Sequence, residues 1–113
     1  MARAISFALT EAQFLDGSKT VTRRLGWRFL APGETLIVVR KAMGLKRGEK
    51  RVLLGTIYVN SVRRERLDAI TCDECAREGF AHLTPGAFVE FFCRAHRCQS
   101  DEFVTRIEFE RLS

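Results

Sequence analysis

The sequence predicts an α+β protein with a small β-barrel at its core. Segments rich in β-branched and aromatic residues recur along the 113-residue chain, and they follow one another without the regular crossover helices of a parallel α/β sheet. We expect about five to six strands flanked by two or three short helices. Because no linker, repeat or low-complexity tract interrupts the pattern, we expect one domain over residues 1–113.

The first expected strand covers residues 3–8, and a short helix follows over residues 9–17. Thr10 and Gln13 stand at the spacing of a capping box at the start of this helix, and Gly17 suits its exit. The helix therefore leads directly into the next segment, SKTVTRRL.

A Pro-Gly turn at residues 32–33 separates that segment from residues 34–41, whose β-branched content predicts a buried strand. A polar connection over residues 44–50 comes next. Residues 51–67 then predict a long strand, because they are too rich in β-forming residues and too polar at their end for a helix. Within this strand, Gly55 marks a bulge or a corner where the sheet curls.

Two further helices are expected in the second half of the chain. Thr71 and Glu74 repeat the capping-box pattern and predict a short helix closed by Gly79. The Thr-Pro pair at residues 84–85 starts another helix. Three aromatic residues at helical spacing face the core from this second helix: Phe88, Phe91 and Phe92.

The last expected strand covers residues 103–112, where residues of two kinds alternate. Alternation with a period of two predicts a strand that is buried on one face and solvated on the other. One face carries Phe103, Thr105, Ile107 and Phe109, and the other carries Val104, Arg106, Glu108 and Glu110.

The chain carries a formal net charge of +5, and its cations gather in residues 18–24, 40–51 and 62–66. A surplus of this kind favours polyanionic partners through attraction and counterion release, so nucleic acid is the first candidate. A solvated face or a charged hairpin tip would account for any one cluster alone. With no apolar run long enough to span a membrane and no secretory signal at the start, we expect a cytoplasmic protein without a membrane partner.

The cysteines offer a CxxC and a CxxxxC spacing, which on counting alone resembles a zinc site. A redox pair and unpaired thiols in a reducing compartment are the other interpretations. We favour unpaired thiols and expect no cofactor, because the second spacing is loose and the first pair falls within an expected helix. His96 fits a surface or helix-end position better than that of a ligand. The four candidate ligands are Cys72, Cys75, Cys93 and Cys98.

The segment SKTVTRRL, residues 18–25, has three hydroxyls and three cations but only two aliphatic residues, Val21 and Leu25. A strand meant only for a core would be mostly aliphatic and aromatic, so this composition indicates a functional site.

The sequence resembles the ASCH domain, a relative of the RNA-binding PUA fold. The resemblance lies in FLDGSKTVTRRL, PGETL, GTIYVNSVRRERL, ITCDECAREGF and VTRIEFERL, which cover nearly the whole chain in order. It implies a small β-barrel with flanking helices and a cleft suited to RNA or a nucleoside.

One enzymatic branch of that family, the bacterial N(4)-acetylcytidine amidohydrolases, is similar in size. Its catalytic set implies that Thr22 is the nucleophile, Lys19 the base, and Glu78 the residue that orients the lysine or transfers a proton. The alternatives are a non-catalytic RNA-binding module and RNA phosphodiester cleavage in the same cleft.

Lysine can act as a base only when neutral, and burial beside cations such as Arg23 or Arg24 would lower the pKa of Lys19. A close Glu78 would raise it. Because side chains alternate along a strand, Lys19 and Thr22 share a site only if Lys19 lies in the turn after Gly17, with regular pairing starting later.

Each of the three residues also has a simpler interpretation. Lys19 could be a solvated cation at a helix exit, Thr22 a residue chosen for β-propensity, and Glu78 a carboxylate on a helix surface. Trp27 could stack on a base or pack in the core. Contacts to a modified nucleoside or single-stranded RNA are expected from Thr20, Arg23, Arg24, Trp27, Arg63 and Arg64.

Overall fold

The computed structural model describes residues 3–41 and 45–112, and within them it confirms the α+β class. The polar connection expected over residues 44–50 begins at Gly44, outside the described residues. In chain order the elements are β1 (Arg3–Ser6), α1 (Glu11–Asp16), β2 (Val21–Arg24), β3 (Thr35–Val39), β4 (Leu53–Arg66), the 3₁₀ turn η1 (Leu67–Ala69), α2 (Cys72–Arg77), α3 (Pro85–His96) and β5 (Phe103–Arg111).

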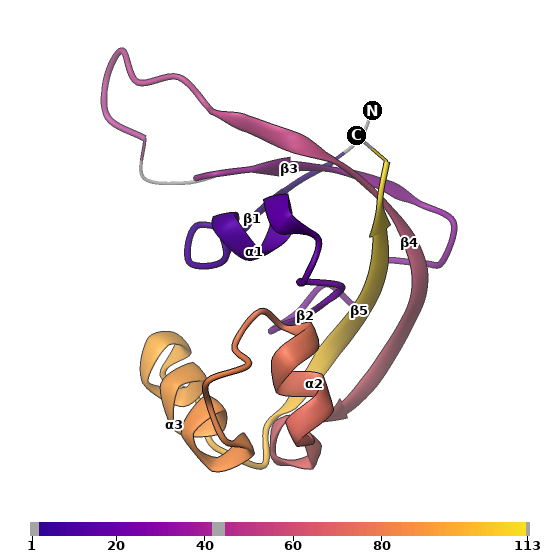
Figure 1. Cartoon of the computed structure of the whole chain (residues 1–113), viewed down its shortest axis with the longest axis vertical. Coiled ribbons are helices and arrows are strands. Elements are labelled where there is room, and N and C mark those ends of the chain that lie inside the picture. Colours follow the sequence, from indigo (N-terminus) through magenta and orange to yellow (C-terminus); the bar gives the residue numbers. More distant parts are fainter. Residues whose placement is uncertain (1–2, 42–44, 113) are drawn as a thin grey trace.

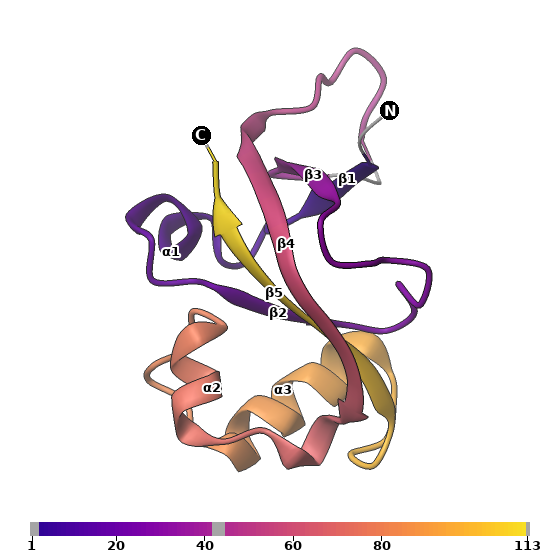
Figure 2. The ribbon, with the colours of Figure 1, turned by 90° about the vertical axis from the view of Figure 1, so that its right-hand side faces the viewer.

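The strands of the described residues form one curled sheet in the order β1-β3-β4-β5-β2. β1 pairs with β3 in parallel, and the other neighbours are antiparallel. The long strands β4 and β5 curve together along the molecule, with α1 near one end of the sheet and α2 and α3 at the other (Figures 1 and 2). The sheet is a half-barrel, because β1 and β2 are its two edges and leave an open seam between them.

The irregularity expected at Gly55 is confirmed. Val38 of β3 faces Gly55, whereas Val39 faces Leu53, so the register shifts by one residue at this point. An extra residue in one strand bends it locally, which helps the sheet to curl.

The helix starts follow the predicted caps in two of three cases. Thr71 accepts a hydrogen bond from the backbone N–H of Glu74 at 3.3 Å, and Thr84 accepts one from Ala87 at 3.1 Å. The capping box predicted at Thr10 is wrong, because its side chain makes no capping bond. Thr10 is buried instead, with its methyl group packed next to Gly79.

The prediction of a half-buried last strand is also wrong in its central part. Residues 104–107 of β5 are buried in succession, and Phe103 is exposed. β5 lies between β4 and β2, and Glu74 of α2 covers Arg106 on the face that was expected to be solvated.

Two apolar clusters hold the fold together. The first lies between α1 and the sheet, and the second lies among η1, α2, α3 and the start of β5. Phe88 and Phe92 belong to the second cluster, as expected, whereas Phe91 is only partly buried. None of the helices within residues 3–41 and 45–112 is long and apolar enough to cross a membrane.

Candidate functional site

A pocket of about 230 Å³ lies at the open seam of the sheet, between the end of β1 and the edge strand β2. Its remaining walls come from the end of α2 and from α3. The lining combines polar and aromatic side chains. The polar groups include Lys19, Thr22, Arg23, Arg24 and Glu78, and the aromatic ones are Phe7, Phe80, Phe88, Phe91, Phe92 and His96.

Lys19 lies in the turn between α1 and β2, as the alternation argument required. Gly17 ends α1 with φ at 85°, the left-handed conformation that glycine adopts without strain. The backbone N–H of Lys19 then donates to Gln13 at 3.0 Å, and regular pairing begins at Val21. The Lys19 side chain points inward and is 4% exposed, so the residue is not a solvated cation.

Within the described residues, both hydrogen bonds of the Lys19 amine go to Glu78, and the amine also lies over the Phe7 ring. Its Nζ donates to the Glu78 backbone carbonyl at 2.7 Å and to Oε1 of the carboxylate at 3.3 Å. Burial lowers the Lys19 pKa to about 8, with Arg24 and Arg23 adding to the effect and Glu78 opposing it. The desolvation of the amine therefore outweighs the neighbouring carboxylate, and a neutral amine is accessible near physiological pH.

Glu78 caps the C-terminus of α2 and is 3% exposed, so it is not a carboxylate on a helix surface. Its second oxygen, Oε2, accepts a hydrogen bond from Arg23 Nη1 at 3.2 Å. The carboxylate thus lies between a lysine and an arginine, which fixes its position.

Thr22 and Arg24 lie two residues apart on β2 and contact each other. Arg24 Nε donates to Thr22 Oγ1 at 3.1 Å, and Arg24 Nη2 donates to the Ser6 carbonyl of β1 at 2.6 Å. Arg24 therefore spans the seam that strand pairing leaves open. It also places a cationic donor on the threonine oxygen.

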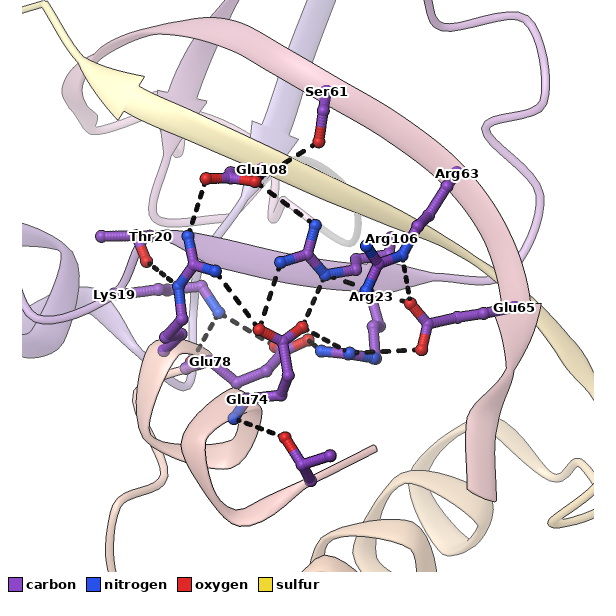
Figure 3. A network of polar contacts seen from close by, with 12 residues as sticks. Lys19, Thr20, Arg23, Ser61, Arg63, Glu65, Glu74, Glu78, Arg106 and Glu108 are labelled. Atoms are coloured by element: carbon purple, nitrogen blue, oxygen red, sulfur yellow. Dashed lines mark hydrogen bonds and ion pairs between the residues drawn. The ribbon is translucent and has the colours of Figure 1, made fainter. Parts of the chain in front are cut away.

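Behind the pocket lies a network of ion pairs that sequence reasoning missed (Figure 3). Glu74 of α2 accepts from Arg23 Nη2 at 2.7 Å and from Arg106 Nε and Nη2 at 2.5 and 3.1 Å. These bonds, chiefly those of Arg106, lower the Glu74 pKa to about 2. In the sheet, Arg106 lies between Arg23 on β2 and Arg63 on β4, and three adjacent cations require carboxylates nearby. This indication of an ion-pair network appears only once the strand register is known.

His96 was expected at a surface or helix end, and it is the last residue of α3. It also lines the pocket and packs against Phe92, with 4.2 Å between the ring centroids and the two planes tilted by 39°. Burial and the charge of Arg24 lower the His96 pKa, so the imidazole is neutral at pH 7. No sequence pattern placed His96 beside residues 19–24.

The other predicted contact residues lie outside the pocket lining. Thr20 is partly buried and accepts a hydrogen bond from Arg77 Nε at 3.0 Å. Trp27 packs against the first apolar cluster. Arg63 and Arg64 are exposed on β4, where they donate to Glu65 and Thr105.

The four cysteines are free thiols. Cys75 is buried in the second cluster and Cys72 is exposed, while the Sγ atoms of Cys93 and Cys98 lie 3.9 Å apart. Among the residues that the structure describes, no group of three or more His, Cys, Asp or Glu side chains is placed to hold a metal ion.

The fold and the pocket together define a small α+β domain with a buried, charged site at the open seam of a curled sheet. A scan against protein-family models found no matching family, and a search of curated proteins found no match either.

Solved structures do match. One is the crystal structure of an Enterococcus faecalis V583 protein of the family model DUF984, with a TM-score of 0.68 and 14% identity over 99% of this chain and 80% of that one. Another is an ASCH domain from Lactobacillus crispatus JV V101, with a TM-score of 0.67 and 17% identity over 96% of this chain and 78% of that one. The chain therefore has an ASCH-type, PUA-like fold, as the sequence resemblance implied.

Proposed function

We propose that the pocket hydrolyses the amide of N(4)-acetylated cytidine, with Thr22 as nucleophile, Lys19 as base and Glu78 as the group that positions Lys19. The observation that carries the proposal is the Lys19 amine. It is buried, its pKa is lowered to about 8, and it is fixed by Glu78 in the pocket that Thr22 also lines.

The hydrogen bonds of Lys19 suit a base. A neutral amine has two N–H donors and one lone pair, whereas the ammonium has three donors and no acceptor. The two acceptors of Glu78, the backbone carbonyl and Oε1, can take both N–H groups of the neutral amine. The lone pair is then left for the hydroxyl of a nucleophile.

The reaction proceeds by acyl transfer. The Lys19 lone pair takes the hydroxyl proton of Thr22 as Thr22 Oγ1 bonds to the acetyl carbon. When the C–N bond breaks, the Lys19 ammonium returns that proton to the departing N4 amine, and cytidine leaves. Water then attacks the acyl-threonine while Lys19 accepts a proton from it. As the ester C–O bond breaks, the Lys19 ammonium returns that proton to Thr22 Oγ1, and the acetic acid released ionises to acetate in solvent.

Arg24 contributes electrostatically. Its Nε donates to Thr22 Oγ1, which favours the ionised form of the nucleophile. A cationic donor at the pocket wall also stabilises the negative charge that develops on the acetyl oxygen.

The test is turnover of N(4)-acetylcytidine, followed as cytidine or acetate release, in the wild type and in Thr22→Val and Lys19→Met. We expect Thr22→Val to abolish turnover and Lys19→Met to reduce it about 10²-fold or more. Arg28→Gln is the control, because Arg28 is an exposed cation outside the pocket lining. Absence of turnover by the folded wild type would rule out N(4)-acetylcytidine as the substrate.

RNA binding without chemistry is the second candidate, and the exposed pair Arg63 and Arg64 on β4 favours it. Phosphate contacts of this kind give affinity that falls with salt. In that case Arg63→Gln together with Arg64→Gln weakens binding to a single-stranded RNA, whereas Thr22→Val does not.

A further inference from the structure

The pocket lining contains one arginine, Arg24, that forms no ion pair with a carboxylate of the described residues, although Glu78 lies close enough to act on its pKa. Four carboxylates of these residues form ion pairs around the pocket, and each is already shared by two or more cations. They are Glu65, Glu74, Glu78 and Glu108. None of the described carboxylates forms an ion pair with Arg24, whose partners are the Ser6 carbonyl and the Thr22 hydroxyl.

Within the described residues, Arg24 also has one donor group, Nη1, that is free to bind a ligand. Nε and Nη2 are engaged, while Nη1 donates to no acceptor among residues 3–41 and 45–112. The guanidinium is partly buried and lies over the Phe7 ring, 5.5 Å from its centroid. An arginine held in this way offers a charge-assisted hydrogen bond to an anion inside the pocket.

The rest of the lining limits what that anion can be. The same cavity has an aromatic part of its lining, with Phe80, Phe88, Phe91 and the packed pair Phe92 and His96. Flat apolar surfaces of this kind favour a planar ring over a hydrated ion. The free donor of Arg24 offers a charge-assisted hydrogen bond that a carboxylate oxygen can accept.

From this lining we propose that the pocket binds small carboxylates attached to a planar aromatic ring, with the carboxylate on Arg24 and the ring on the aromatic residues. The inference deepens the proposed function without depending on turnover. If the hydrolysis holds, the acetate released is itself a small carboxylate, and it should compete with substrate.

Protonation of Lys19 couples to this binding. The charged groups facing Arg24 and Lys19 are Glu78 at the end of α2, Arg23 of β2 and His96 of α3. Glu78 stays paired with Arg23, and His96 is neutral above pH 7 because its pKa is lowered. Lys19 loses its positive charge as the pH rises through about 8, so carboxylate affinity should fall over that range.

The experiment is calorimetric titration of the full chain with benzoate and with benzamide, its neutral isostere. We expect the wild type to bind benzoate about 10-fold or more tightly than benzamide. This comparison needs no variant. Arg24→Gln should remove that preference and Arg24→Lys should keep part of it. Arg28→Gln, which removes an exposed cation outside the lining, should leave both affinities unchanged.

Equal affinity for benzoate and benzamide, or no benzoate binding at about 10 mM, would overturn the inference. An unchanged preference in folded Arg24→Gln would do the same. Benzoate binding in a protein that does not hydrolyse N(4)-acetylcytidine would leave the anion site standing and reject the proposed reaction. Hydrolysis of N(4)-acetylcytidine without any preference for benzoate would support the proposed reaction and reject the carboxylate site.

Discussion

At the scale of single residues, the burial of the Lys19 amine affects both its protonation and the stability of the fold. A pKa lowered from 10.5 to about 8 corresponds to about 3 kcal/mol that disfavours the charged form in the folded protein. Between these two values the unfolded chain binds more protons than the folded one, so this residue makes stability rise with pH over that window. Below about pH 8 the buried amine is charged and lowers the free energy of unfolding by its full amount.

Under the proposed function, the rate of hydrolysis should depend on pH through the same group. We expect kcat/KM to rise with pH and level off above an apparent pKa near 8, because only the neutral amine accepts a proton. Glu78→Gln removes the charge that raises the Lys19 pKa, so the rise should move to lower pH. Arg24→Gln removes a charge that lowers this pKa and should move the rise to higher pH.

These opposite shifts distinguish an effect on the Lys19 pKa from a general loss of structure. A variant that only loosens the fold lowers the rate at every pH without displacing the curve. Shifts of the same sign in Glu78→Gln and Arg24→Gln, or a rise that stays in place in both, would rule out Lys19 as the titrating group.

The sequence analysis predicted that Lys19 lies in a turn and, through the family resemblance, that Glu78 orients it. It did not predict the ion pairs of Glu74 with Arg106. Alternation along a strand, together with Gly17, required Lys19 to lie in a turn, and that is a local argument. Glu74 and Arg106 are separated by thirty-one intervening residues and meet only because β5 pairs with β2 and α2 packs against them. A single sequence contains no register, so this contact could not be predicted.

At the scale of elements, α2 delivers the buried acid groups to the site. Glu74 and Glu78 lie four residues apart and so project from the same side of one helical turn. The helix has only six residues and is too short to be stable alone, so its ends must be fixed by other contacts. Thr71 fixes the start, and Gly79 packs against α1 just after the end.

Two glycines in left-handed conformation provide a matched pair of substitutions. Gly17 has φ at 85° and open space where a methyl group would lie, whereas a Cβ at Gly79, with φ at 96°, would lie 3.0 Å from Gln13 Cβ. We expect Gly17→Ala to cost about 1 kcal/mol of unfolding free energy and Gly79→Ala about 2–3 kcal/mol, since the second adds overpacking to backbone strain. Urea unfolding at pH 7 measures both, and equal losses would show that α1 and α2 do not meet closely here.

The cap of α2 gives a second prediction at this scale. Thr71→Ala removes the acceptor for the Glu74 N–H and should cost about 1 kcal/mol, whereas Thr71→Ser keeps the hydroxyl and should cost much less. Thermal unfolding of the two variants provides the comparison. A loss in Thr71→Ser as large as in Thr71→Ala would show that the methyl group, not the hydrogen bond, stabilises this end.

The type of each helix and strand was predictable from local sequence patterns, whereas the burial of individual residues was not. Turn residues and β-branched runs gave the strands and helices of the described residues in the right order. The alternation of β5 failed over residues 104–107 because a central strand is covered on both faces. Its position in the sheet depends on pairing across the whole chain.

At the scale of the molecule, the open seam explains why a pocket and an ion-pair network occur together. A closed barrel would pair β1 with β2 and fill the space between them. Here Arg24 bridges the two edges, and the pocket is lined by Phe7 of the first apolar cluster and by Phe88 and Phe92 of the second. The pocket therefore lies where the two clusters meet the open seam.

The network should make the whole fold sensitive to acid. The pKa of Glu74 is about 2 in the folded protein and near 4.5 without its partners, so its stabilising effect is complete above pH 4.5 and is lost as pH falls toward 2. With the side chain 14% exposed, the shift corresponds to about 3 kcal/mol. We expect Glu74→Gln to lose a similar amount at pH 7, since Arg23 and Arg106 are then left buried with less compensation.

Urea unfolding of the wild type and Glu74→Gln between pH 7 and pH 2 tests this expectation, and the two curves should converge at the acid end. Glu90→Gln is the matched control, because Glu90 pairs with Arg94 on the exposed face of α3 and such pairs contribute about 0.5 kcal/mol or less. If Glu74→Gln behaves like this control, the network adds nothing to stability, and its arginines and glutamates serve the pocket alone.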